Sequence, residues 1–206
     1  MHGRVGRAMM VFWKARLVIL AVPKTGSEAL EAALAARADM AIRFPPFYRH
    51  MNVAWYEKSL KKLFLPEDKA RLETLAVVRE PVDWLGSWYR YRARADLDGT
   101  ERSTRALGFA DFVEGWLAEP PPPFANVGRQ SRFCARADGS LGIDHLFAYE
   151  APETLHAFLE ARTGLAVRTE RVNVSPLRDT TLPEALRDRL RRQATAEFEL
   201  HARARR

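Results

Sequence analysis

Apolar residues gather in short, nearly continuous runs, and each run is followed by a segment with helical spacing. Residues 16–22 (RLVILAV) form the first run, and residues 75–79 (LAVVR) and 144–149 (DHLFAY) form two more. Runs of this length, rich in β-branched and aliphatic side chains, are typical of strands buried on both faces. The pattern therefore predicts three strands, and residues 167–172 are a candidate for a short fourth.

The segments between these runs have apolar residues at every third or fourth position. Residues 27–38 form the first, a second begins at Pro81, and residues 152–162 form the third. Residues 182–201 predict a long, charged helix. Because strands alternate with helices, we expect right-handed crossovers and a mainly parallel sheet. The prediction is an α/β protein with one domain over residues 1–206, in which helices flank the central sheet of a three-layer, P-loop-like fold.

Ligands of such sheets bind beyond the carboxyl ends of the strands, which makes the turn after the first strand a candidate site. That turn reads Pro23-Lys24-Thr25-Gly26-Ser27 and leads into a helix. Gly26 lets the backbone turn sharply, so that amides at the helix start can converge on an anion beside Lys24. The lysine precedes the glycine, so the nucleotide-triphosphatase motif G-x-x-x-x-G-K-[ST] is absent. The alternative is a tight turn in which Ser27 caps the helix.

The second strand ends in a comparable turn. Arg79 leaves the sheet edge there, and Ser87 lies eight residues on, about two turns into the following helix. Together they could hold a second phosphate beside the first. The alternatives are a structural salt bridge between Arg79 and Glu80 and a packing role for Ser87.

The two turns together resemble those of the sulfotransferases that use 3′-phosphoadenosine 5′-phosphosulfate (PAPS). The first resembles that family's loop for the 5′-phosphosulfate, and the pattern Arg79-x-Pro81 with Ser87 resembles its 3′-phosphate site. The resemblance continues over residues 15–177 through Pro45-Pro46-Phe47-Tyr48-Arg49-His50, Phe147-Ala148-Tyr149-Glu150 and Asn173-Val174-Ser175-Pro176. The whole is similar to compact bacterial sulfotransferases near the carbohydrate-modifying branch.

The resemblance implies an enzyme that moves a sulfuryl group from PAPS to an acceptor hydroxyl or amine, for example on a carbohydrate. After transfer, the donor is left as 3′-phosphoadenosine 5′-phosphate (PAP). Lys24 is implied to neutralise the bridging oxygen as the S–O bond breaks. No metal is required by this scheme. The implied donor-binding residues are Pro23, Lys24, Thr25, Gly26, Ser27, Glu28, Arg79 and Ser87.

Two positions depart from the family pattern. Glu28 stands where a hydroxyl residue is common, and its carboxylate would repel a phosphosulfate unless it points away. Trp84 stands where many relatives have a second arginine. The 3′-phosphate would then be held by fewer charges, or by a cation from elsewhere such as Arg129, Arg132 or Arg178.

An acceptor hydroxyl needs a base that works near neutral pH, and imidazole suits that task. His50 lies among arginine and aromatic residues between the first helix and the second strand, where the resemblance also implies a histidine. His50 is therefore the candidate catalytic base, and the alternative is a packing or solvated residue. Glu57 and Glu150 are fallback bases, although Glu150 at a strand end is more typical of an orienting carboxylate.

The charge and composition of the chain limit the classes of ligand and partner that it is expected to bind. The 206 residues include 33 Lys and Arg against 26 Asp and Glu, and 27 of the cations are Arg, whose planar fork suits phosphate or sulfate. A nucleotide-binding, kinase-like phosphotransferase is one alternative, against which the position of the loop lysine counts. A basic nucleic-acid-binding module is another, but it predicts a contiguous arginine stripe, and the arginines here are scattered. We expect a nucleotide donor and a hydroxyl-bearing acceptor as partners, and no nucleic acid.

The cysteine content and the start of the chain bear on location. Cys134 is the single cysteine, which excludes an internal disulfide or a zinc site of several cysteines and fits a reducing cytoplasm. Lys14 and Arg16 interrupt the apolar residues 9–22, so we expect no membrane span. No small-x-small cleavage site follows, so we expect no signal peptide and a cytoplasmic protein.

Overall fold

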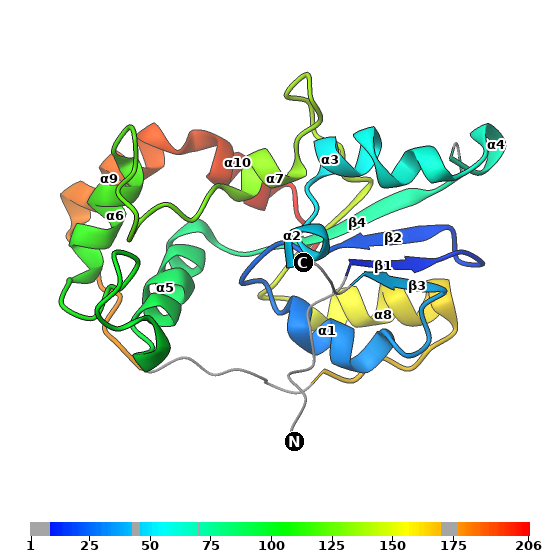
Figure 1. Cartoon of the computed structure of the whole chain (residues 1–206), viewed down its shortest axis with the longest axis horizontal. Helices are drawn as coiled ribbons and strands as arrows, with labels where there is room; N and C mark the ends of the chain where they lie inside the picture. The colour runs from blue at the N-terminus through cyan, green and yellow to red at the C-terminus, as the bar shows by residue number, and fades with distance from the viewer. Residues whose placement is uncertain (1–8, 43–45, 70, 170–176) are drawn as a thin grey trace.

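The computed structural model describes residues 9–42, 46–69, 71–169 and 177–206. Five strands form its central sheet, in the order β3-β1-β2-β4-β5 (Figure 1). They are β1 (Met9–Phe12), β2 (Leu17–Leu20), β3 (Met40–Ile42), β4 (Glu73–Val78) and β5 (His145–Ala148). The strands β2, β4 and β5 run parallel, whereas β1 is antiparallel to both of its neighbours.

The sheet is therefore mixed. The predicted α/β class is confirmed, but the prediction of a mainly parallel sheet is wrong. The difference arises from the hairpin that joins β1 to β2, in which the Arg16 amide donates to the Trp13 carbonyl at 3.1 Å. Arg16 has a φ of 53°, a left-handed conformation that glycine and asparagine usually provide. Since neither residue is present, residues 9–13 look like an isolated apolar run rather than the first strand of a hairpin.

Helices lie on both faces of the sheet and at one side of it (Figure 1). They are α1 (Ser27–Leu34), α2 (Pro46–Arg49), α3 (Val53–Lys58), α4 (Pro66–Lys69), α5 (Pro81–Arg92), α6 (Phe109–Leu117), α7 (Gln130–Cys134), α8 (Pro152–Thr163), α9 (Glu184–Gln193) and α10 (Thr195–Ala202), with the 3-10 turns η1 (Leu60–Leu63) and η2 (Ala95–Leu97). No helix of the described residues is long and apolar enough to cross a membrane.

Alternating strand positions supply the two faces of the core. Val18 and Leu20 of β2 belong to the cluster that includes side chains of α3, η1 and α10. Leu17 and Ile19 belong to the opposite cluster, with α1 and α8. This alternation follows from the two-residue period of a strand, and it makes β2 apolar throughout. A third cluster joins α5, α6 and α9 beside the sheet.

The segment after α8 differs from its prediction. Residues 167–169 form no strand, and the rest of the candidate fourth strand lies outside the described residues. The helix predicted over residues 182–201 is two helices, because the chain leaves helical geometry at Ala194, where φ is −116°. Beyond α10, Arg205 exchanges backbone hydrogen bonds with Leu146 and Ala148, each 2.9 Å long, along the outer edge of β5.

Candidate active site

The turn after β2 is shaped mainly by its own residues. Gly26 has φ 76° and ψ 10° and is the N-cap of α1. A Cβ there would lie 3.1 Å from the ring of Tyr149, so both conformation and space favour glycine. The buried Thr25 hydroxyl donates to the Val22 carbonyl at 2.8 Å. Lys24 also has a left-handed φ, of 69°, which a non-glycine residue adopts only where its surroundings require it.

The first amides of α1 are available to a ligand. Both hydrogen bonds that close the first helical turn end on the Gly26 carbonyl, from Ala29 at 3.0 Å and Leu30 at 3.3 Å. Within the described residues, no group accepts a hydrogen bond from the amides of Gly26 and Ser27. Free amides at a helix start, with the positive end of the helix dipole, form an anion site.

Arg79, at the end of the neighbouring strand β4, reaches back to the first turn. Its Nη1 donates to the Lys24 carbonyl at 3.4 Å, and its guanidinium lies 4.3 Å from the centre of the Tyr149 ring. Its Nε lies 2.5 Å from Asp83 Oδ2. The ionic partner of Arg79 is therefore Asp83, one turn into α5, and not Glu80, which instead caps the start of α5.

A side chain from α7 holds the backbone of the second turn. Gln130, only 1% exposed, accepts from the Arg79 amide and donates to the Arg79 carbonyl, both at 2.9 Å. Glu197 of α10, 2% exposed, accepts in turn from the amides of Gln130 at 3.0 Å and Ser131 at 3.1 Å. Its carboxylate thereby caps the start of α7, where negative charge is favourable.

A second contact from α10 supports the same turn through Glu150. One oxygen of Glu150 accepts from the Glu80 amide at 2.7 Å, and the other lies 3.0 Å from Nε2 of His201 on α10. Both oxygens of this carboxylate are therefore engaged in holding the second turn. This arrangement favours the orienting role for Glu150 over the role of a base.

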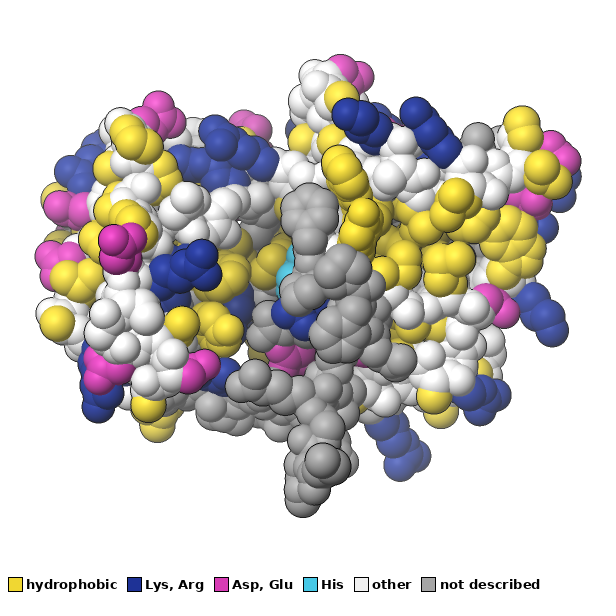
Figure 2. Space-filling model, viewed as in Figure 1, with side chains coloured by type: hydrophobic (Ala, Val, Ile, Leu, Met, Phe, Trp, Pro, Cys, Tyr) yellow, Lys and Arg dark blue, Asp and Glu magenta, His cyan; other side chains and the backbone are white. Residues whose placement is uncertain are grey.

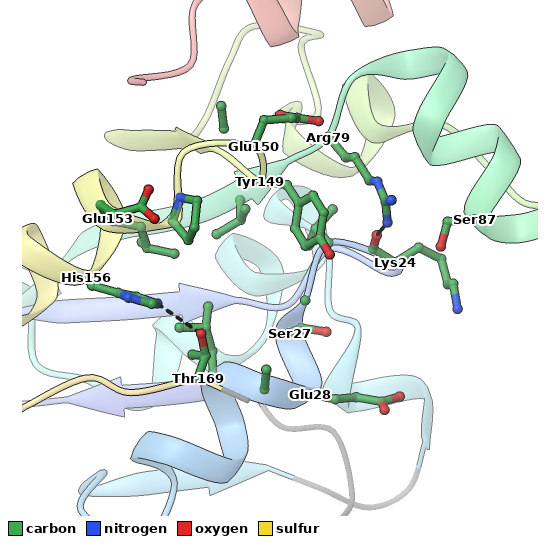
Figure 3. Close-up of a pocket in the computed structure, with 18 residues that line it drawn as sticks. Lys24, Ser27, Glu28, Arg79, Ser87, Tyr149, Glu150, Glu153, His156 and Thr169 are labelled. Atoms are coloured by element: carbon green, nitrogen blue, oxygen red, sulfur yellow. Dashed lines mark hydrogen bonds between the residues drawn. The ribbon is translucent and has the colours of Figure 1, made fainter. Parts of the chain in front are cut away.

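One pocket of about 610 Å³ brings the two turns together (Figure 3). This volume lies in the range of small-molecule and cofactor sites. Of the predicted donor-binding residues, Lys24, Thr25, Gly26, Ser27, Glu28, Arg79 and Ser87 line it. Pro23 does not line it, but its carbonyl accepts from the indole N–H of Trp84 at 2.9 Å. The Trp84 side chain thus ties the second turn to the first.

The charged side chains around the pocket differ in direction. The Lys24 ammonium lies against α5, 4.3 Å from the ring centre of Tyr91 and 5.8 Å from that of Trp88. In Figure 3, Ser87 of the same helix lies beside the end of the Lys24 side chain, and the Glu28 carboxylate points away from the second turn. Glu28 nevertheless lines the pocket, in the first turn of α1.

The three other candidate cations lie elsewhere. Arg129 stacks on Trp116 and Arg178 on Tyr89, with the guanidinium carbon 4.0 Å and 4.2 Å from the ring centres. Burial lowers the pKa of the Arg129 guanidinium. Arg132 does not line the pocket either. Among the cations singled out in the sequence, the structure brings only Lys24 and Arg79 to this pocket.

His50 lies next to the strand end that leads into the first turn. Its Nδ1 is 2.8 Å from the Ala21 carbonyl oxygen. Because a carbonyl can only accept, Nδ1 carries the hydrogen, and the neutral ring has its lone pair on Nε2. His50 lines a second pocket, of about 560 Å³, together with Trp55 and Glu57, and not the pocket that contains Lys24. The candidate base therefore contacts the strand end that leads into the first turn, but it lines a different pocket from the two turns.

The single cysteine adds no reactive thiolate to the pocket. Cys134 is fully buried, and burial raises the pKa of its thiol, which disfavours the reactive thiolate. In the part of the chain that the structure describes, no three His, Cys, Asp or Glu side chains are grouped so that they could hold a metal ion.

Comparisons of the chain with protein-family models, with curated proteins and with solved structures find no match. The chemistry of the pocket is therefore inferred from its own groups. One turn offers amides and a lysine, and the other offers a guanidinium and a hydroxyl, which are two sets of anion ligands at adjacent strand ends. The supporting residues Gln130 and Glu197 have no local sequence signal and emerge only from the fold.

Proposed function

We propose that this protein transfers a sulfuryl group from PAPS to an acceptor hydroxyl or amine. The observation that carries the proposal is the convergence of two anion-binding turns on one pocket, with Arg79 touching the Lys24 carbonyl at 3.4 Å. A donor with a phosphosulfate at one position and a phosphate at another requires two such turns. Adjacent parallel strands provide them in a P-loop-like arrangement.

The residues suit the donor's chemistry. The amides of Gly26 and Ser27 can bind the phosphosulfate oxygens, and the missing Cβ at residue 26 leaves the backbone accessible. Arg79 uses Nε for Asp83 and Nη1 for the Lys24 carbonyl, and within the described residues its Nη2 has no acceptor. That edge of the guanidinium, with the Ser87 hydroxyl, can bind the 3′-phosphate.

Sulfuryl transfer depends mainly on alignment and charge stabilisation. The acceptor oxygen forms a bond to sulfur while the bond from sulfur to the bridging oxygen breaks, and negative charge develops on that bridging oxygen. The amides at the start of α1 hold the group in place. The Lys24 ammonium moves from the ring of Tyr91 to neutralise the developing charge. The proton of the acceptor passes to a base.

His50 is the predicted base: when the ring is neutral and its Nδ1 donates to the Ala21 carbonyl, the lone pair is on Nε2. An acceptor bound in the second pocket must then extend to the first turn. Replacing His50 with alanine should lower turnover about 10²–10⁴-fold without weakening PAP binding. Steady-state rates of PAP release and calorimetric titrations measure the two quantities. Unchanged turnover would assign His50 a packing role and leave Glu57 as the candidate.

The decisive test is a calorimetric titration with PAP, AMP and ATP. A charge-assisted hydrogen bond contributes about 1.5–3 kcal/mol, so wild type should bind PAP about 10–150-fold more tightly than AMP. Arg79→Ala should bind the two nucleotides almost alike, and Arg79→Lys should restore only part of the difference. Equal binding of PAP and AMP by wild type contradicts the proposal, and a preference for ATP favours a phosphotransferase.

Arg90 provides the matched control. It contacts Asp83 at 3.5 Å, as Arg79 does at 2.5 Å, but it does not line the pocket. Arg90→Ala should therefore leave the preference for PAP over AMP within about twofold of wild type, as expected for an ion pair near the surface. An equal loss in both variants would mean that the preference reflects general charge rather than a site.

A further inference from the structure

Lysine is rare in this chain and unevenly distributed. Residues 13–16 and 57–71 contain seven of the Lys and Arg residues against three carboxylates, in a chain whose net charge is +7. Two of those carboxylates, Asp68 and Glu57, pair with Arg16 at 3.1 Å and with Arg136 at 3.2 Å. Five of the six lysines lie in these two segments, namely Lys14, Lys58, Lys61, Lys62 and Lys69.

Two exposed leucines stand among these lysines. Leu63 at the end of η1 is 74% exposed, and Leu65 just before α4 is 61% exposed. Phe64 between them packs against Trp13 in the hairpin turn between β1 and β2, with ring centroids 5.2 Å apart. The contact between Phe64 and Trp13 therefore holds the backbone of this segment, while the two leucine side chains on either side of Phe64 face solvent. Figure 2 shows hydrophobic, basic and acidic side chains together at the end of the molecule where Figure 1 has α4.

We propose that this leucine tip, residues 58–66 with Lys14, docks on the surface of an anionic lipid bilayer. Leu63 and Leu65 enter the boundary between headgroups and acyl chains. The ammonium groups of Lys58 and Lys62, both exposed, lie at the level of the lipid phosphates. Exposed apolar side chains with lysines nearby in the sequence match this interface, because long lysine stems keep the charge in water while the apolar groups are buried.

A bilayer suits the tip better than a second copy of this chain. In a symmetric dimer, the same patch faces itself, so the lysines of one copy would face those of the other. Two leucines are also too few for the apolar core of a stable protein interface. A bilayer accepts protruding side chains and brings negative charge, so it requires neither a complementary pocket nor a large contact area.

The test is co-sedimentation of the full chain with vesicles of phosphatidylcholine alone and of phosphatidylcholine with phosphatidylglycerol. Wild type should bind only the anionic vesicles, and added salt should weaken binding. Leu63→Ser with Leu65→Ser should lower the partition coefficient about tenfold for each leucine. Leu177→Ser is the matched control, because Leu177 is 96% exposed but lies outside the tip.

A second pair of variants tests the charge. Replacing Lys58, Lys61 and Lys62 with glutamine should weaken binding about fivefold for each lysine. The matched control replaces three exposed arginines of α9 with glutamine and changes the net charge equally, namely Arg187, Arg191 and Arg192. That control should bind like wild type.

The outcomes that overturn the proposal are distinct. Absence of binding to anionic vesicles by wild type, or equal losses in the tip and α9 variants, excludes a specific lipid-binding tip. A wild-type dimer in sedimentation velocity that dissociates in the Leu63/Leu65 variant assigns the patch to a second copy instead. Unchanged thermal midpoints confirm that the surface variants are folded.

Discussion

The two turns of the candidate site are built in different ways. The first has local contacts of its own, the Thr25–Val22 hydrogen bond and the left-handed Gly26, and Trp84 and Arg79 donate to two of its carbonyls from farther along the chain. The second depends on residues far along the chain. Arg79 pairs with Gln130, 51 positions later, and Gln130 pairs with Glu197, 67 positions beyond that. A short sequence motif can therefore contain many of the contacts that hold one turn and few of those that hold another.

The difference has a physical origin. A glycine turn at a helix start satisfies its backbone locally or leaves amides for the ligand. The second turn, in contrast, has a backbone amide and carbonyl at Arg79 that must be paired inside the protein. The Arg79 side chain, which we propose binds an anion, is then separate from the groups that hold the Arg79 backbone. The comparison predicts that Lys24 variants change mainly the rate of transfer. Variants of Gln130 and Glu197, which support the second turn, should lower the free energy of unfolding and, for Gln130, the preference for PAP over AMP.

The largest effect is expected at Lys24. Lys24→Ala should lower the rate of transfer about 10²–10³-fold, because its charge acts on the leaving oxygen in the transition state. The affinity for PAP should change only a few-fold, since the amides of the turn remain. PAP release from PAPS and calorimetry measure the two quantities. Wild-type turnover in this variant would contradict the role of Lys24.

The next effect is expected at Gln130. Gln130→Leu keeps the size of the side chain but leaves the Arg79 amide and carbonyl unpaired, which should cost about 2–4 kcal/mol of unfolding free energy. The preference for PAP over AMP should shrink as well. Urea denaturation and nucleotide titration measure both effects. Gln193→Leu, at an exposed position of α9, is the control, and an equal loss there would remove the special role of Gln130.

The next prediction concerns Glu197, which accepts hydrogen bonds at the start of α7 and so holds Gln130 in place. Glu197→Gln should cost about 2 kcal/mol, because a buried carboxylate that accepts from two amides becomes a neutral group with one acceptor. Hydrogen exchange of the Gln130 and Ser131 backbone amides should also become faster in this variant. Glu199→Gln, exposed on the same helix, should change neither quantity. Slow exchange in the Glu197 variant would show that α7 is held by other contacts.

The first turn has its own stability test at Gly26. Gly26→Ala should cost about 1–2 kcal/mol, because an L-residue is strained at φ 76° and its Cβ would approach Tyr149. Gly99→Ala is the matched control, since φ there is 71° with no atom within 4 Å. The difference between the two variants in thermal unfolding isolates the contact with Tyr149. Equal losses would mean that only the backbone conformation requires glycine.

The smallest effect is expected at Ser87. Ser87→Ala removes one neutral donor, which should weaken PAP binding by about 0.5–1.5 kcal/mol. AMP binding should stay the same, because AMP lacks the 3′-phosphate. Calorimetry with both nucleotides measures the two values. An equal loss for AMP and PAP would place the effect of Ser87 in the packing of α5.

Local signals made part of this molecule predictable from its sequence. The parallel strands and the helices after them follow from apolar runs and helical spacing, and the first turn follows from a glycine between a strand and a helix. The strands β1 and β3 do not, because the turn at Arg16 lacks glycine and asparagine, and β3 has only three half-buried residues. The two turns were expected to lie side by side, and Arg79 does touch the Lys24 carbonyl.

The supporting residues could not be predicted in this way. Gln130 and Glu197 each look like an ordinary polar residue of a helix, and only the packing of α7 against α10 brings them together. Tyr149 lies in a segment that carries the resemblance, but its stacking on Arg79 depends on the register of β5 beside β4. Long-range pairing of this kind has no period or spacing in the sequence.

The position of α10 also has a consequence for the order in which the protein is assembled during synthesis. During synthesis, all residues of the first turn leave the ribosome long before Glu197 does. The second turn is therefore complete only when Glu197 can accept from the amide of Gln130, which holds the Arg79 backbone. The outer edge of β5 likewise stays unpaired until Arg205 arrives to bond Leu146 and Ala148. An exposed strand edge is a template for pairing with other chains. Incomplete chains should therefore contain the turn at Gly26 and still be the form most prone to aggregate.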